Sequence, residues 1–375
     1  RFSARSRVYP FNGPITAGSA ILTMTESPGG TALSRAASLL TGAVVLWLAV
    51  LPADATPAGK PDSAIPLEAY ARPATLVRVA TGRNLNIRCS GSGSPTVILT
   101  AGAGEQSLTW RSLQTQLAAA TRVCAWDRAG FGFSDPSPAP QDIAHTSDDL
   151  EAVLAGAKLR PPYVLVGHSL GSYETLMLAF RHPGRVSGIV LIDPSAPHQN
   201  QRLRKAAPAT YAAIDALQQE QTADLKACIG LMEQKPNDAG CLRPPDPGYP
   251  ASLRTVLSQR EHNVAAQRNL LSLLENAFTE RDSQELEGAW RSLGSTPLIV
   301  LTAGEPPPVP LPPAAQAQMP QLQAEWSRMH DEIAALSSRG VNRTVPGATH
   351  YIYLERPEVV AAAVLEVLAA ARENR

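Results

Sequence analysis

The sequence lacks several features that would assign it to whole classes of protein. It has no basic run and no excess of positive charge, since 33 Lys and Arg balance 33 Asp and Glu, and we therefore expect no nucleic-acid partner. Its four cysteines form no CxxC pair, it has no HExxH motif, and its seven histidines are scattered. Because no metal-ligand spacing is present, we expect no metal and no other cofactor.

The apolar run near the N-terminus is short for a membrane span. It covers residues 36–51, or 16 residues, whereas a spanning helix needs about 20. Arg35 precedes it, and Ala53 and Ala55 follow it with the spacing of a signal-peptide cleavage site. We expect an exported protein, periplasmic or secreted, that is cleaved after Ala55. The alternative is an uncleaved N-terminal anchor, and only then would the chain contact a membrane.

The cysteines are few but even in number, which is consistent with an exported chain. Cys228 and Cys241 are 13 positions apart within a helical stretch, so a disulfide between them would close a short loop. Cys89 and Cys124 lie on two predicted strands. The alternative is that all four are buried thiols. With 375 residues, 44% of them hydrophobic, the chain is long enough for a sizeable core.

The most informative segment that is present runs from an apolar strand, residues 163–166, directly into Gly167-His168-Ser169-Leu170-Gly171. A helical pattern follows at once. This strand–turn–helix context is what a GxSxG nucleophile elbow requires. The turn is so tight that the residues two before and two after the serine must be small, as Gly167 and Gly171 are. We expect the Ser169 hydroxyl to stand clear of the sheet beside a helix N-terminus.

Strand-like and helix-like segments alternate along most of the chain. The predicted strands before and after the elbow cover residues 76–80, 85–90, 96–100, 122–126, 186–193, 297–302 and 341–345, and the predicted helices cover residues 108–120, 146–157, 170–181, 314–337 and 357–371. This alternation predicts an α/β fold with a mostly parallel sheet and helices on both faces. Chemistry in such sheets gathers at the carboxyl ends of the strands. Five candidates follow directly on predicted strands: Ala103, Ser169, Asp193, Glu305 and His350.

Residues 195–290 interrupt the alternation. They are rich in Ala, Gln, Leu, Glu and Arg and predict a helical insert that forms a lid over the site and lines a moderately apolar pocket. The remaining organisation is an upstream extension with a signal peptide at 1–55, a linker at 56–74, the N-terminal part of the core at 75–194 and the C-terminal part at 291–375.

Over roughly residues 75–370 the chain resembles the α/β-hydrolase superfamily, and in particular its serine esterases and lipases. Four segments carry the resemblance: the elbow at 167–171, the loop Thr100-Ala101-Gly102-Ala103-Gly104, the segment from Asp127-Arg128 to Ser134-Asp135, and Gly347-Ala348-Thr349-His350-Tyr351. In the second segment, Ala101 stands where the family usually has a histidine. The resemblance implies a hydrolase sheet with a lid inserted after the sixth strand. It also implies that Cys89 and Cys124 are able to pair, since the family's second and fourth strands are neighbours.

The resemblance also suggests roles for individual residues. A serine hydroxyl needs a base to take its proton, and His350 ends a late strand before the final helix, so we expect Ser169 as nucleophile and His350 as base. The oxyanion donors would be the backbone N–H groups of Ala103 and Leu170. We interpret His168 as a packing or pocket-lining residue. Asp127 and Arg128 are interpreted as a structural ion pair or capping cluster.

The acid that would orient the histidine is ambiguous. In the family it usually follows the strand predicted at 297–302, where this sequence has only Glu305 followed by prolines. Some dehalogenases of the superfamily instead carry their acid at the strand predicted here at 186–193, which ends in Asp193. Because the prolines fix the backbone after Glu305, we favour Asp193 and keep Glu305 as the alternative. A lid carboxylate is a third choice.

The expected function is that of an exported serine hydrolase. It would cleave a carboxylic ester or related acyl bond of a small molecule through an acyl-enzyme on Ser169. A cofactor-free haloperoxidase or a C–C bond hydrolase on the same triad is an alternative that the resemblance leaves open. A non-catalytic binding protein on a hydrolase scaffold is another, because a fold alone does not establish activity.

Overall fold

The central strands are buried on both faces because their sequences are apolar without alternation. Every residue is buried in β3 (Thr96–Thr100), β5 (Tyr163–His168) and β7 (Leu298–Ala303). This computed structural model describes residues 64–80, 82–235, 240–306 and 310–373. The predicted signal peptide and its cleavage after Ala55 lie outside these residues. No helix in the described part of the chain has the length and apolar character needed to cross a membrane.

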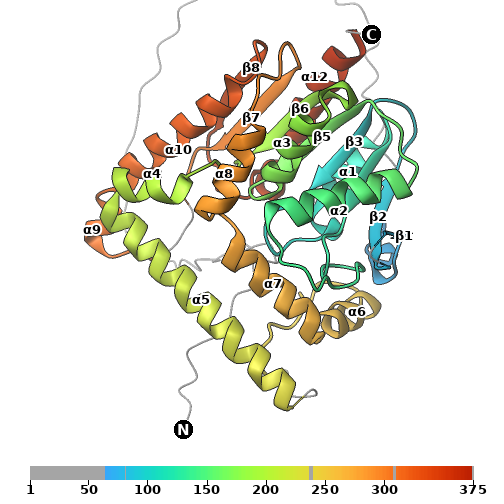
Figure 1. Ribbon diagram of the computed structural model, residues 1–375. Helices are drawn as coiled ribbons and strands as arrows, with labels where there is room; N and C mark the ends of the chain where they lie inside the picture. The colour runs from blue at the N-terminus through green and yellow to red at the C-terminus, as the bar shows by residue number, and fades with distance from the viewer. Residues whose placement is uncertain (1–63, 81, 236–239, 307–309, 374–375) are drawn as a thin grey trace, which may run out of the picture. The chain divides into compact units, whose positions relative to one another are not determined.

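Eight strands form one sheet in the order β1-β2-β4-β3-β5-β6-β7-β8 (Figure 1). The other five strands are β1 (Thr75–Arg78), β2 (Asn84–Ser90), β4 (Val123–Trp126), β6 (Val186–Ile192) and β8 (Gly340–Val345). The pairs β1–β2 and β2–β4 are antiparallel. All pairs from β4 to β8 are parallel, so the carboxyl ends of six strands meet at one edge. The predicted α/β fold is confirmed.

Helices cover both faces of the sheet, and each face has its own apolar core. Successive side chains of a strand point to opposite faces, and in β5 Leu165 belongs to one core while Val164 and Val166 belong to the other. The first core is closed by α2 (Ile143–Gly156), α3 (Gly171–Arg181), α8 (Glu280–Ala289) and α10 (Met319–Ala334). The second is closed by α1 (Arg111–Leu117) and α12 (Pro357–Glu373).

Five helices occupy the stretch between β6 and β7 where the sequence predicts a helical insert. In addition to α8 they are α4 (Gln199–Ala206), α5 (Pro208–Gln234), α6 (Ala251–Glu261) and α7 (Val264–Asn276). Figure 1 shows α5, α6 and α7 extending away from the sheet. The insert therefore adds a helical layer beyond the two-sided core.

Two predicted helices are divided in the structure. The helix expected at 314–337 is split into α9 (Pro313–Gln316) and α10, and Pro320 lies in the first turn of α10, where its missing N–H is tolerated. The helix expected at 108–120 begins as a 3-10 turn, η2 (Ser107–Trp110), before α1. The remaining short elements are η1 (Leu67–Ala71), η3 (Pro183–Arg185) and α11 (Ile352–Glu355).

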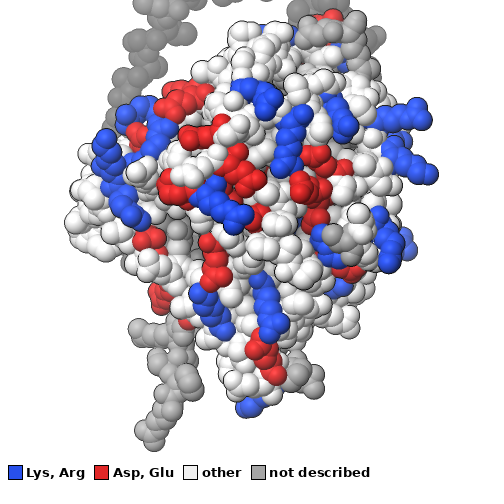
Figure 2. Space-filling model, in the orientation of Figure 1, with Lys and Arg blue, Asp and Glu red and all other residues white. Residues whose placement is uncertain are grey.

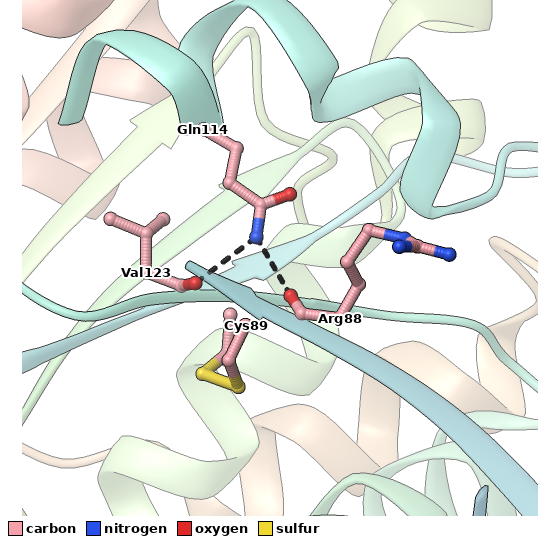
Figure 3. Close-up of a disulfide and its surroundings, with 5 residues drawn as sticks. Arg88, Cys89, Gln114 and Val123 are labelled. Atoms are coloured by element: carbon pink, nitrogen blue, oxygen red, sulfur yellow. Dashed lines mark hydrogen bonds between the residues drawn. A yellow bond between two sulfur atoms is a disulfide. The ribbon is translucent and has the colours of Figure 1, made fainter. Parts of the chain in front are cut away.

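The antiparallel end of the sheet is joined covalently. Cys89 of β2 and Cys124 of β4 face each other and form a disulfide (Figure 3). Next to it, the buried side chain of Gln114 donates from Nε2 to the carbonyl oxygens of Arg88 at 2.7 Å and Val123 at 3.1 Å. One side chain of α1 thus bridges the backbones of both strands. A second disulfide in the insert joins Cys228 of α5 to Cys241.

Charged side chains of both signs intermix on the face of the molecule that Figure 2 shows. Among the described residues, exposed ion pairs include Arg343 with Glu366 at 2.7 Å and Arg202 with Glu332 at 2.5 Å. Exposed pairs of this kind contribute little to stability. The balanced formal charge of the chain is therefore distributed over this face rather than separated into patches.

We predict that removing the Cys89–Cys124 disulfide destabilises the protein more than removing Cys228–Cys241. The bonded cysteines are 35 and 13 positions apart, and loop-closure entropy gives about 4 and about 3 kcal/mol for loops of these lengths. Urea unfolding of Cys89→Ala/Cys124→Ala and Cys228→Ala/Cys241→Ala measures both values against the oxidised parent. Equal losses, or a larger loss for the shorter loop, would contradict the prediction.

Candidate active site

The turn after β5 holds Ser169 in a conformation that few side chains adopt, with a φ of 50°. A Cβ atom at Gly167 would lie 2.7 Å from the carbonyl oxygen of Gly171, and a Cβ atom at Gly171 would lie 2.4 Å from the carbonyl oxygen of Thr100. Both distances are too short for any side chain. The two glycines therefore allow the tight turn around Ser169, as the GxSxG pattern predicts.

Backbone hydrogen bonds tie this turn to the end of β6. The N–H of Ser169 donates to the carbonyl oxygen of Ile192 at 3.1 Å, and the N–H of Ser195 donates to the carbonyl oxygen of Ser169 at 3.1 Å. Asp193 lies between these two partners and also has a positive φ, 41°. The strained ends of two neighbouring strands are thus held together.

The carboxylate of Asp193 contacts the imidazole of His350. Its Oδ2 lies 2.6 Å from His350 Nδ1, while its Oδ1 accepts hydrogen bonds from the N–H of Ala303 and from Trp326 Nε1, both at 2.9 Å. Asp193 is 3% exposed, whereas the His350 side chain is 26% exposed. A buried carboxylate with three donors thus fixes the ring of a partly accessible histidine.

The two groups shift each other's pKa values. Burial by itself raises the pKa of Asp193, but the hydrogen bond and positive charge of His350 outweigh it and lower that pKa to about 2. Burial lowers the pKa of His350, but the hydrogen bond and the charge of Asp193 more than compensate, and the net shift is upward. Asp193 is therefore ionised near neutral pH, and its charge favours the imidazolium form of His350.

Glu305, the alternative candidate for the acid in the sequence analysis, does not contact His350. Its backbone N–H donates to the carbonyl oxygen of Ala348 at 2.9 Å, but its side chain is exposed to solvent. The Nδ1 atom of His350 is directed to Asp193 instead. Of the two candidates for the acid, only Asp193 is brought to the histidine.

Two backbone N–H groups at the carboxyl ends of β3 and β5 have no acceptor within the described residues. Within the described residues, neither the N–H of Ala103 nor that of Leu170 donates a hydrogen bond to the protein. Leu170 directly precedes α3, whose N-terminal end carries partial positive charge. Ala103 follows β3, which is the neighbour of β5 in the sheet. These are the two donors that the sequence analysis expected at an oxyanion hole.

His168 is a buried packing residue, as one part of its interpretation holds, with its ring 4.7 Å from the rings of both His350 and Tyr353, but it also makes polar contacts that the sequence did not indicate. Its Nδ1 lies 3.1 Å from Glu105 Oε2, and its Nε2 lies 3.0 Å from the carbonyl oxygen of His350. The same Glu105 oxygen accepts the N–H of Gly102 at 2.6 Å, and its other oxygen accepts the hydroxyl of Tyr353. His168 thus bridges three loops. Sequence analysis did not identify Glu105 as part of the site. Its position directly after the glycine loop that follows β3 is the feature that could have indicated it.

Asp127 caps neighbouring backbone, as the capping interpretation expects, but Asp127 and Arg128 do not pair with each other. The buried carboxylate of Asp127 accepts the N–H groups of Ser107 at 2.6 Å and Phe133 at 3.1 Å, and therefore caps η2 and its own loop. Arg128 forms an ion pair with Glu174 of α3, with 2.5 Å between Nε and Oε1. No local sequence pattern indicates Glu174 as this partner.

A cavity of about 90 Å³ lies between the insert and the core. Its lining is mostly apolar and comes from the insert helices and from the core loops that contain Gln106 and Phe131. Burial raises the pKa of Glu261, which also lines it, to about 7, although the charge of Arg243 acts in the opposite direction. Among the described residues, no three His, Cys, Asp or Glu side chains are grouped so that they could hold a metal.

The chain belongs to the α/β hydrolase family, because the model of that family matches residues 97–363. Among curated proteins, it is 24% identical over 281 residues to the uncharacterized protein YqjL of Bacillus subtilis, which covers 75% of this chain and 86% of that protein. A shorter match, 44% identical over 73 residues, covers 20% of this chain and only 14% of the uncharacterized protein C23C11.06c of Schizosaccharomyces pombe.

Solved structures share this fold. The crystal structure of DBJA has a TM-score of 0.60 at 17% identity, covering 80% of this chain and 98% of that one. The structure of a thermophilic esterase from Thermogutta terrifontis has a TM-score of 0.50 at 20% identity, covering 79% and 98%. At these identities the likeness establishes the fold alone, and it is the family that supports a hydrolase.

We predict that Asp193→Asn lowers kcat far more than Glu305→Gln does. An amide at position 193 no longer stabilises the imidazolium and holds the ring in the wrong tautomer, a change that costs up to about 10⁴-fold in kcat in serine triads. Glu305→Gln changes an exposed side chain and serves as the matched carboxylate-to-amide control. Ester turnover of both variants, measured on folded protein, decides the order, and the reverse order would move the acid to Glu305.

Proposed function

We propose that this protein is an exported serine hydrolase that cleaves a carboxylic ester or a related acyl bond through an acyl-enzyme on Ser169. The observation that carries the proposal is the 2.6 Å contact between Asp193 and His350 at the sheet edge where Ser169 emerges from a strained turn. A hydroxyl, an oriented imidazole and two unused backbone N–H groups are the components that acyl transfer requires.

In this mechanism the Ser169 oxygen attacks the carbonyl carbon of the substrate. His350 takes the hydroxyl proton, and Asp193 stabilises the imidazolium that forms. The negative charge that develops on the carbonyl oxygen is stabilised by the N–H groups of Ala103 and Leu170. His350 then gives its proton to the leaving alcohol, and water repeats the sequence to release the acid and free Ser169.

The disulfides support the export part of the proposal. The four cysteines of the chain are joined in two pairs, one in the sheet and one in the insert, and such bonds persist in oxidising compartments. The periplasm and the extracellular medium both provide that condition.

The insert supports the part of the proposal that concerns the substrate. The insert would act as the lid over the site. Its mostly apolar cavity against the core is lined by none of Ser169, Asp193 and His350, so it is the apolar content of the insert helices that favours a substrate with an apolar portion. A solved structure of the same fold is titled a thermophilic esterase, in line with an ester substrate. A panel of p-nitrophenyl esters of increasing acyl length would define the preferred chain.

We predict that a fluorophosphonate probe labels the parent protein and that Ser169→Ala abolishes both labelling and ester hydrolysis. The probe reacts only with an activated serine, so a binding protein on this scaffold would not label. Ser187→Ala, a change in the half-buried part of β6, is the matched control and should retain both activities. Labelling that survives in Ser169→Ala would refute the assignment of the nucleophile.

We also predict that kcat/KM decreases as the pH is lowered, with a midpoint above pH 6.5, the ordinary pKa of histidine. His350 acts as a base only when neutral, and its net pKa shift is upward, so more alkaline solution is needed to deprotonate it. In Asp193→Asn the group that raises this pKa is lost, and the midpoint should move to lower pH. A profile of kcat/KM against pH measures both, and an unchanged midpoint in the variant would contradict this assignment.

A further inference from the structure

Arg128 is a buried cation that contacts the loop after β3 as well as its acidic partner. It is 2% exposed. Its Nε and Nη2 donate to the two carboxylate oxygens of Glu174 at 2.5 and 2.9 Å. Its Nη1 donates to the carbonyl oxygen of Gly102 at 2.9 Å, and its Nη2 also donates to that of Ala101 at 2.6 Å. One guanidinium therefore joins α3 to two successive peptide groups.

The carbonyl oxygen of Gly102 accepts the bond from Arg128 Nη1 at 2.9 Å and a longer one from the N–H of Glu105 at 3.4 Å, and the direction of this carbonyl determines the direction of the neighbouring N–H. A peptide group is planar and trans, so the carbonyl of Gly102 and the N–H of Ala103 point in opposite directions from the same plane. When Arg128 holds that carbonyl, the Ala103 N–H is directed away from Arg128. The preceding peptide behaves in the same way, because its carbonyl at Ala101 bonds to Arg128 while its N–H at Gly102 bonds to Glu105.

Glu174 connects Arg128 and the loop after β3 to the second oxyanion donor, the N–H of Leu170. It lies in the first turn of α3 and is 1% exposed, and α3 begins directly after Leu170. The guanidinium is planar, and its fork matches a carboxylate in two places, so the bidentate bond fixes both the position and the orientation of Arg128 relative to α3. The N–H groups of Ala103 and Leu170 are thus linked through Gly102, Arg128 and Glu174.

We propose that Arg128, oriented by Glu174, is the positioning residue that sets the direction and spacing of the two oxyanion donors. This inference rests on the proposed function, since it gives the pair a task in acyl transfer. A buried ion pair is not in itself strongly stabilising compared with apolar residues of similar size. The two bonds to loop carbonyls satisfy N–H groups of Arg128 that Glu174 leaves over, and they place those acceptors on the loop that carries the Ala103 donor.

The test uses two kinds of variant and matched controls. Arg128→Lys keeps the charge that Glu174 requires but loses the fork, and Arg128→Met/Glu174→Met replaces the whole pair by apolar side chains. The controls are the same changes at Arg83 and Asp149, a second bidentate pair with bonds of 3.0 and 2.6 Å. That pair joins the loop before β2 to α2 and does not contact the loop after β3. Thermal unfolding identifies the variants that fold.

The readouts are kcat, KM and the inhibition constant of an aryl trifluoromethyl ketone. Such a ketone forms a bond to the serine oxygen, the hydroxyl proton passes to the histidine, and the former carbonyl oxygen becomes an anion in the oxyanion hole. Losing one oxyanion donor typically lowers kcat by about 10²–10³-fold. We expect both Arg128 variants to lose kcat on this scale with little change in KM, and to lose affinity for the ketone by a similar factor.

The outcomes separate the two proposals. A folded Arg128→Met/Glu174→Met variant with parental kcat would overturn the positioning role and leave the serine mechanism intact. If that variant does not fold, Arg128→Lys decides in the same way. A loss of kcat without a loss of ketone affinity would also overturn it, as would equal losses in the control variants. A parent protein that neither hydrolyses esters nor binds the ketone would instead refute the proposed function.

Discussion

The strained turn at Ser169 is the constraint on which the arrangement of the site depends. It exists only because Gly167 and Gly171 present hydrogen atoms where side chains would collide with backbone. The conformation is stabilised from outside, through the hydrogen bonds that join Ser169 to Ile192 and Ser195. Conformations of this kind cost about 1–3 kcal/mol and persist only where the surroundings impose them. Here the surroundings are the parallel strands β5 and β6, whose carboxyl ends are held in register.

Buried charges then organise the loops around that turn. Asp193 receives three donors and orients His350, while Glu105 receives donors from the loop after β3, from Tyr353 and from His168. His168 in turn contacts the backbone of His350, so the two systems meet. Each carboxylate is almost fully buried and is compensated by several hydrogen bonds, as buried charge requires. The side chains of the site are therefore each held by several hydrogen bonds.

The sequence could predict the parts of this arrangement that depend on local pattern. Apolar runs and the helices between them identify the parallel sheet, and the GxSxG turn requires its glycines. The prolines after Glu305 favour Asp193 over Glu305 as the partner of His350, and Asp193 is the carboxylate that contacts His350 in the structure. The divided helix at α9 and α10 was missed because the alanine and glutamine residues around it favour helix more strongly than Pro320 opposes it.

Contacts between distant segments could not be predicted in the same way. Arg128 and Glu174 are 46 positions apart, and Glu105 and His168 are 63 apart. From the sequence alone, Glu174 is indistinguishable from any polar residue of the helix after the elbow. It is buried because α3 packs against the sheet, which the local sequence does not reveal. Long-range ion pairs of this kind depend on the fold itself, and a single sequence carries no periodic signal for them.

The most direct measurement concerns the covalent intermediate. The parent protein is mixed with excess p-nitrophenyl acetate, quenched with acid within milliseconds and digested for mass spectrometry. At a pH low enough to slow deacylation below acylation, the proposed mechanism predicts a burst of p-nitrophenol close to the enzyme concentration and one added acetyl group on the peptide that contains Ser169. An acetyl group on another residue, or turnover without any acylated Ser169, would contradict it.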